Sequence, residues 1–118
     1  MMRTLALIAY PVGMAAGQAM FKVASADLRG AEGASLMRAG LGLALNPWFI
    51  AAVALYGLLS VGWVWILAGM PLSTAYPFVA LAFVITPLLG HFLFGEALGW
   101  NHIVGLVLLT VGLTFILR

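Results

Sequence analysis

The chain has 118 residues, of which 65% are hydrophobic and only 7% are charged, and its mean hydropathy is +1.19. A soluble domain carries roughly 25% charged residues, so five basic and three acidic side chains cannot cover a surface exposed to water. The composition indicates an integral membrane protein with room for about four helical spans of about 20 residues each. It excludes a sizeable soluble catalytic domain. The net charge of +2 gives no sign of nucleic-acid binding, and the absence of cysteine excludes disulfides and thiolate metal sites.

Charges and prolines divide the chain into apolar segments. An uncharged run ends at Lys22, a mixed segment reaches Arg38, and a second uncharged run continues to Gly95. Gly69-Met70-Pro71 divides this long run, because proline is tolerated in the first turn of a helix but not in its interior. Asn46-Pro47 is a similar start signal, with asparagine as the cap. We therefore predict an all-α fold, an integral membrane bundle forming one domain over residues 1–118, with four transmembrane helices at about 4–24, 47–69, 72–94 and 99–117.

Residues 26–46 form the one long connection, which is rich in glycine and alanine. Within it, Ala34–Leu45 is predicted as a short interfacial helix. The N-terminal stretch also fits a cleaved signal peptide, although Pro11 interrupts its apolar run. The basic residues leave the orientation open, because they are divided between the two sides of a four-span chain: Arg3 and Arg118 on one, Arg29 and Arg38 on the other.

The first span carries a polar stripe. Met14, Gln18 and Lys22 are spaced four residues apart and share one helix face. A lysine at the centre of a membrane costs about 2.5–3.5 kcal/mol and so points to function, the alternative being that it snorkels from the helix end to the lipid headgroups. Gln18 lies one turn deeper and needs a partner or a wet cavity. Gly13 and Gly17 form a small-residue face suited to close helix packing.

Aromatic residues mark the second span. Tyr56, Ser60 and Trp63 fall on one face of the helix. Such a stripe can line a cavity, although aromatic residues also form belts at the membrane interface. We take Tyr56 and Trp63 as candidate lining residues of a substrate cavity.

The third span contains two prolines. Pro87 cannot donate a hydrogen bond to the carbonyl of Phe83, so a kink or a freed carbonyl is expected there. Broken helices are tolerated in membranes only where protein or water satisfies the backbone. Tyr76, beside Pro77, supplies a hydroxyl group near the start of this span.

No catalytic constellation is found. The carboxylates Asp27, Glu32 and Glu96 are widely spaced, and the spacing of His91, Glu96 and His102 matches no metal-ligand pattern. We interpret these side chains as interfacial polar residues. The chain is not expected to be an enzyme, and no metal or cofactor is expected.

The last span carries Gly105 and Gly112, one heptad apart, which clears a groove for another helix. Four helices enclose little volume, so a transport path would form more readily between protomers. We therefore predict dimerisation through this span.

Three short stretches then give a resemblance. They are Gly17–Lys22, Met70–Pro77 and Gly95–Leu98, and their order and spacing resemble the four-helix members of the drug/metabolite transporter superfamily over nearly the whole chain. The glycine spacing of the last span is similar to the dimer contact of small multidrug resistance proteins. The resemblance implies a multi-pass protein of the bacterial inner membrane, working as a homodimer or with a related small subunit.

Two branches of the superfamily compete. Small multidrug resistance exporters couple drug efflux to protons through a glutamate in helix 1. The position aligned with that glutamate is Met14, which cannot exchange a proton. Gly17-Gln18, Lys22 and Ala75-Tyr76-Pro77 look more like the small subunits that flip undecaprenyl-phosphate-linked aminoarabinose.

The leading hypothesis is therefore a flippase for a polyprenyl-phosphate-linked sugar or a similar anionic lipid. In this hypothesis Lys22 is a lone cation that receives the phosphate, Gln18 and Tyr76 hydrogen-bond the headgroup, and Arg38 is a second candidate cation. The predicted substrate-binding residues are Gln18, Lys22, Tyr56, Trp63 and Tyr76. The alternatives are an exporter of small metabolites or drugs, and a non-transporting membrane subunit.

Overall fold

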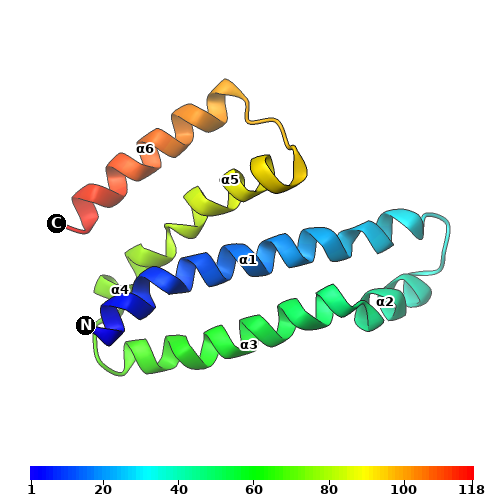
Figure 1. Ribbon diagram of the computed structural model, residues 1–118, viewed down its shortest axis with the longest axis horizontal. Helices are drawn as coiled ribbons and strands as arrows, with labels where there is room; N and C mark the ends of the chain where they lie inside the picture. The colour runs from blue at the N-terminus through cyan, green and yellow to red at the C-terminus, as the bar shows by residue number, and fades with distance from the viewer.

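The computed structural model describes residues 1–118 as an all-helical chain, as predicted (Figure 1). Its extents are 51 × 37 × 20 Å, and the two termini lie at the same end of the molecule. The helices, in order, are α1 (Met2–Gly30), α2 (Leu36–Leu45), α3 (Pro47–Leu67), α4 (Leu72–Val79), α5 (Ala82–Phe94) and α6 (Trp100–Ile116).

Helices α1 and α3 form the centre of the fold and run antiparallel, side by side (Figure 1). Two glycines of α1 allow this close approach. A Cβ atom on Gly17 would stand 2.5 Å from the ring of Tyr56, and one on Gly13 would stand 2.9 Å from the side chain of Leu59. Gly13 and Gly17 therefore serve as the packing face that the sequence predicts.

Helix α1 is longer than the predicted 4–24 and continues to Gly30. The prediction ended the helix where charges begin, but charged residues are compatible with helical backbone. The Ser25 hydroxyl donates to the Lys22 carbonyl at 2.6 Å within this extension. A helix of this length rises about 43 Å, more than the roughly 30 Å of membrane hydrocarbon. In a membrane its charged last turns therefore reach beyond the hydrocarbon.

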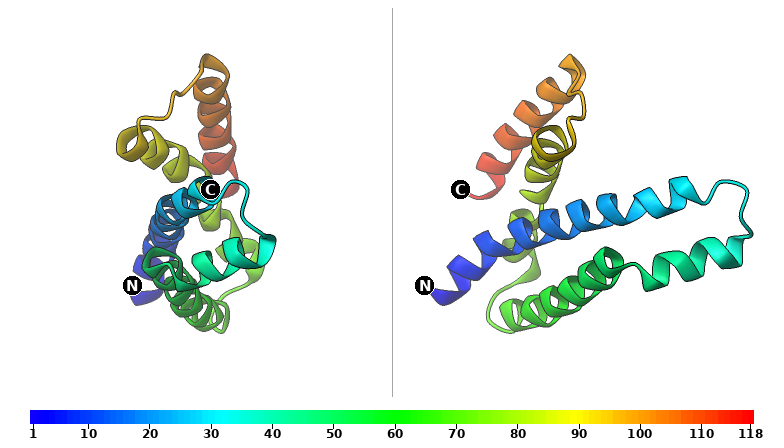
Figure 2. Two further views of the ribbon diagram at one scale, coloured as in Figure 1. Left: turned by 90° about the vertical axis from the view of Figure 1, so that its right-hand side faces the viewer. Right: turned by 45° about the vertical axis from the view of Figure 1, so that its right-hand side comes forward.

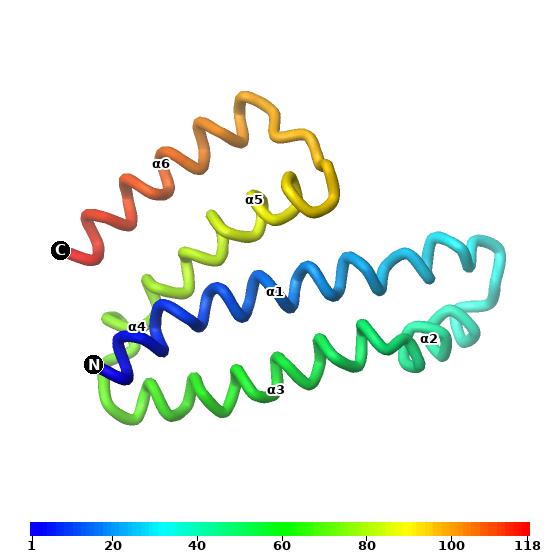
Figure 3. Tube along the Cα trace, viewed as in Figure 1, coloured from blue at the N-terminus to red at the C-terminus, as the bar shows by residue number.

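The region predicted as one helix over 72–94 is two helices, separated by a turn at Ala80 and Leu81. In this turn the Ala80 N–H bonds to the Pro77 carbonyl and the Leu81 N–H to that of Phe78, each three residues back. The interruption thus lies between the two prolines, about one turn before the carbonyl that Pro87 was expected to free. Figure 3 shows the chain changing direction between α4 and α5.

The predicted start signals are confirmed. The Asn46 side-chain oxygen accepts hydrogen bonds from the N–H groups of Trp48 at 2.8 Å and Phe49 at 3.3 Å, which caps α3 at Pro47. Asn46 is also nearly buried, and its amide donates to the Asp27 carboxylate near the end of α1. The short helix predicted over Ala34–Leu45 is present as α2, which begins after the cap residue Ser35.

Three helical segments are long and apolar enough to cross a membrane: α1, α3, and α4 with α5 taken together. Helix α6 is apolar but has 17 residues, so it is shorter than these three. It packs chiefly against α5 and stands apart from the α1–α3 pair (Figure 2). Most of its surface is exposed, and Leu113 is its one buried residue.

Little of the chain is buried. Only 11 of 118 residues are buried, and the core cluster consists of Leu7, Ile66 and Ala75, where α1, α3 and α4 meet. Large apolar side chains cover the outside of every helix. This is the reverse of a soluble protein and fits a chain surrounded by lipid.

Candidate functional site

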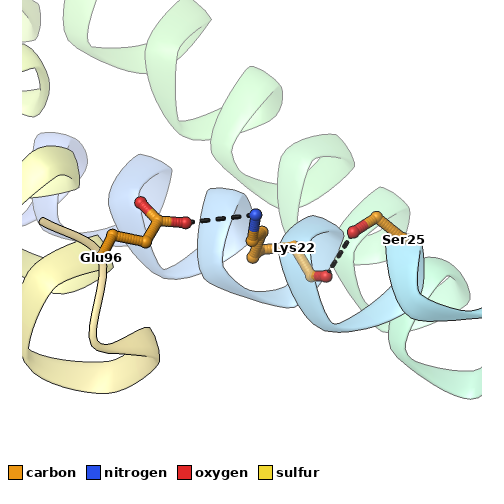
Figure 4. A network of polar contacts seen from close by, with 3 residues as sticks. All are labelled: Lys22, Ser25 and Glu96. Atoms are coloured by element: carbon orange, nitrogen blue, oxygen red, sulfur yellow. Dashed lines mark hydrogen bonds and ion pairs between the residues drawn. The ribbon is translucent and has the colours of Figure 1, made fainter. Parts of the chain in front are cut away.

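An ion pair joins α1 to the segment after α5. The Lys22 Nζ atom lies 3.1 Å from the Glu96 Oε1 atom (Figure 4). The two side chains are 45% and 48% exposed, so both ions remain accessible. Lys22 is therefore not the lone cation expected from the sequence, because a carboxylate 74 positions further along the chain already neutralises it.

The backbone holds Glu96 in place. Gly95 ends α5 with a φ of +64°, a left-handed conformation that glycine adopts without steric cost. The Glu96 N–H then donates to the Gly90 carbonyl at 3.2 Å, and the His91 Nδ1–H donates to the Glu96 carbonyl at 2.8 Å. A Cβ atom on Gly90 would stand 2.5 Å from the Glu96 Oε2 atom, so the carboxylate lies directly over this glycine.

His91 is thus occupied with the backbone oxygen of Glu96 rather than with its carboxylate. No three His, Cys, Asp or Glu side chains gather closely enough to hold a metal ion.

The ion pair lines a cavity of about 340 Å³ between α1 and α5. Besides Lys22 and Glu96, its polar groups are Gln18, Ser25 and Thr86. The remaining lining residues are small or apolar: Ala15, Ala19, Phe21, Leu89, Gly90 and Phe94.

A second cavity of about 400 Å³ adjoins the first and is more apolar. Gln18 and Thr86 line both cavities, which places these two side chains where the cavities meet. The second cavity is further lined by Met14, Tyr76, Val79, Ala82, Phe83 and Pro87. Because Tyr76 is 61% exposed and Phe83 is 66% exposed, this cavity opens onto the outside of the chain.

A hydrogen-bonded chain orients Gln18. Its Nε2 atom donates to the Tyr56 hydroxyl at 2.9 Å, and that hydroxyl donates to the Met14 carbonyl at 3.0 Å. Gln18 therefore has the partner that its depth requires, and its amide oxygen has no protein donor. Tyr56, predicted to line a substrate cavity, contacts Gln18 but lines neither of the two cavities.

The other predicted site residues are divided. Tyr76 lines the apolar cavity, whereas Trp63, which was predicted to line a cavity, lines neither. The ring of Trp63 packs against that of Tyr10, with centroids 4.8 Å apart, and against that of Tyr76, with centroids 6.4 Å apart. Arg38 is exposed in the first turn of α2 and also lines neither cavity. The structure thus brings together Gln18, Lys22 and Tyr76, with Tyr56 behind Gln18.

Comparison with known proteins gives one family match. Residues 6–118 match the model of the EamA-like transporter family. The chain belongs to the EamA-like transporter family. It is accordingly a membrane transporter of the drug/metabolite transporter superfamily and a multi-pass protein of the bacterial inner membrane, as the resemblance in the sequence implied.

Several curated proteins are similar to part of the chain. A probable 4-amino-4-deoxy-L-arabinose-phosphoundecaprenol flippase subunit ArnE from Proteus mirabilis is 33% identical over 66 residues, which is 56% of this chain and 58% of that protein. The protein with the same description from Pectobacterium atrosepticum is 35% identical over the same shares. One from Pseudomonas aeruginosa is 33% identical over 73 residues, 62% of this chain and 64% of that protein. The match thus spans less than two thirds of each relative. No solved structure matches the chain.

Sequence reasoning missed the position of Glu96, which lies beside Lys22 in the polar cavity of this EamA-like chain. A signal was available, because Glu96 is the one Asp, Glu, Lys or Arg residue between Arg38 and Arg118. An isolated carboxylate in so long an apolar stretch is itself a functional indication. Met14 lines the apolar cavity and supplies no titratable group there.

Proposed function

We propose that this chain is a flippase, or a flippase subunit, for a polyprenyl-phosphate-linked sugar or a similar anionic lipid. The observation that carries the proposal is the junction of the two cavities. One contains an accessible ammonium group and the Gln18 amide, and the other is apolar and opens outward. A phosphate-linked headgroup fits the first, while its hydrocarbon tail leaves through the second into the bilayer.

The site lies at a suitable depth for this task. Lys22 stands five residues before Asp27, which is about 7–8 Å along a helix. Asp27 and Arg29 belong to the charged end of α1 that reaches beyond the hydrocarbon. Lys22 thus lies just inside the boundary where lipid headgroups enter, and a cation is the group that a phosphate requires there. The ArnE proteins, described as flippase subunits for a phosphoundecaprenol-linked sugar, support the same assignment.

The membrane arrangement is part of the proposal. We place α6 as a fourth span, because 17 residues rise about 25 Å and the two termini share one end of the molecule, as an even number of crossings requires. The bare surface of α6, including Gly105 and Gly112, which have no heavy atom within 4 Å of an added Cβ, is the surface we assign to a second copy or a related small subunit.

The test is flipping of a fluorescent polyprenyl-phosphate sugar in proteoliposomes. Lys22→Ala and Gln18→Ala should slow flipping at least tenfold while leaving the amount of folded protein unchanged. Arg29→Ala is the matched control, since it removes a cation from the same helix outside both cavities. Unchanged flipping by the Lys22 and Gln18 variants would contradict the proposal.

A second candidate function has one observation in its favour. Glu96 is a half-exposed carboxylate in the polar cavity, which is what an exporter of cationic drugs requires. Proton-driven efflux of a cationic dye from vesicles, lost in Glu96→Gln, would support that function instead. If the purified chain moves neither lipid nor dye but co-purifies with a transporter, it is a non-transporting subunit.

A further inference from the structure

We infer that Lys22 and Glu96 together recognise a zwitterionic lipid headgroup, with the phosphate on Lys22 and a primary ammonium group of the sugar on Glu96. This inference rests on the proposed flippase function and assigns the specificity of the same site. Glu96 then selects for lipids whose sugar carries a free amine.

The geometry allows one ligand to reach both ions. The two side chains come from different elements, α1 and the segment after α5 (Figure 4). Both line the polar cavity. Each remains about half exposed despite their contact. An ion pair between exposed groups contributes little to stability, so a ligand with better partners for both ions can separate it.

Charge balance favours a ligand that carries both a negative and a positive group. A simple anion on Lys22 would face the Glu96 carboxylate across a small cavity, and like charges at short range repel. A simple cation on Glu96 would face the Lys22 ammonium in the same way. A headgroup with a phosphate and an ammonium group replaces one ion pair with two and leaves the net charge of the cavity unchanged.

Glu96 is also held in position to receive an amine. Its backbone is fixed on both sides by the bonds to Gly90 and His91, and its carboxylate lies over Gly90. Lys22, by contrast, is a long flexible side chain. When the pair separates, Lys22 therefore moves with the phosphate while the carboxylate stays at the cavity wall.

The experiment compares two lipids with the same tail. One is undecaprenyl phosphate carrying an amino sugar, and the other is the same lipid with its amine acetylated, which removes the positive charge. Binding to the full chain in nanodiscs is measured by native mass spectrometry. The wild type should bind the free-amine lipid roughly tenfold more tightly, the ratio expected for one charge-assisted hydrogen bond.

Variants then assign the preference. Glu96→Gln should bring the ratio close to one and leave binding of the acetylated lipid unchanged or tighter, because Lys22 is released. Lys22→Gln should weaken binding of both lipids. Glu32→Gln, the matched control, removes an exposed carboxylate outside both cavities and should keep the wild-type ratio. If Glu96→Gln does not fold, Gly90→Ala tests the same point, since it keeps the charge but displaces the carboxylate and should lower the ratio.

The outcomes separate the two proposals. Equal binding of both lipids by the wild type, or a preference that survives in Glu96→Gln, overturns the role of Glu96 and leaves the flippase proposal standing. Failure of the wild type to bind or flip either lipid overturns both.

Discussion

The ring of Tyr56 in α3 lies directly on Gly17 of α1, with its Cε2 atom 2.5 Å from the point where a Cβ atom would stand. From this position the Tyr56 hydroxyl reaches past the glycine to the Met14 carbonyl and accepts a hydrogen bond from Gln18. One tyrosine thus sets both the spacing of the two central helices and the orientation of a cavity side chain.

The first prediction concerns this spacing. Gly17→Ala should destabilise the chain by about 1–3 kcal/mol, because the new methyl group forces the Tyr56 ring aside. Gly57→Ala is the control, since a Cβ there meets nothing within 4 Å and should be neutral or stabilising by up to about 1 kcal/mol. Unfolding in nanodiscs measures both. Equal stability of the two variants would show that α1 and α3 are not in close contact at Gly17.

The second prediction concerns the hydroxyl group alone. Tyr56→Phe keeps the ring but removes the acceptor for Gln18 and the donor to Met14. We expect a loss of about 1 kcal/mol in stability. The rate of flipping should fall further than the loss of folded protein explains, because Gln18 loses its fixed orientation in the cavity. If Tyr56→Phe flips lipid like the wild type, the orientation of Gln18 does not matter for transport.

The third prediction concerns the junction of α1 with α3. Asn46→Ala removes the α3 cap and the bond to Asp27, and should cost about 2 kcal/mol, towards the upper end for a helix cap. Asn46→Asp keeps a capping oxygen but replaces the amide that donates to Asp27 with a second carboxylate. The stability lost in Asn46→Asp therefore reports the contact between α1 and the start of α3 separately from the cap. Ser35→Ala, which removes the single capping bond of α2, should cost less. Thermal unfolding that ranks Ser35→Ala as the most damaging would contradict this assignment.

The fourth prediction concerns assembly. Gly105→Leu and Gly112→Leu add side chains where the single chain has open space, so the fold of one protomer should not change. Loss of the dimer in cross-linking in lipid would therefore place α6 in the interface. Gly62→Leu, at an open glycine of α3, is the control and should leave the dimer intact. A dimer that persists in both α6 variants would exclude these glycines from the contact.

Features encoded by neighbouring residues were predictable from the sequence. Asn46-Pro47 marks the start of α3 because a cap and a proline act within one turn, and Pro71 precedes α4 for a similar reason. Gln18 and Lys22 were placed on one face because helix periodicity alone determines it. Both line the same cavity.

Features that depend on distant residues were not predictable. The contact between Lys22 and Glu96 arises from how α5 packs against α1, and no local pattern in either segment indicates it. Trp63 shares a helix face with Tyr56 and yet packs against Tyr10 outside both cavities. Helix periodicity could not predict this difference, because it identifies the face of a helix but not the element that packs against it. The turn at Ala80 and Leu81 lies between Pro77 and Pro87, and the missing hydrogen bond of Pro87, which involves the Phe83 carbonyl, does not predict its position.

The scarcity of shielded side chains has a practical consequence for handling this protein. In hydrocarbon, helices gain no hydrophobic benefit from leaving lipid for one another, so their mutual arrangement depends on the few specific contacts between them. Each helix, however, keeps its own backbone hydrogen bonds in any apolar surroundings. Harsh short-chain detergents should therefore separate α6 from α5 while circular dichroism still reports full helicity. A preparation judged intact by its spectrum can already have lost its ability to hold a lipid.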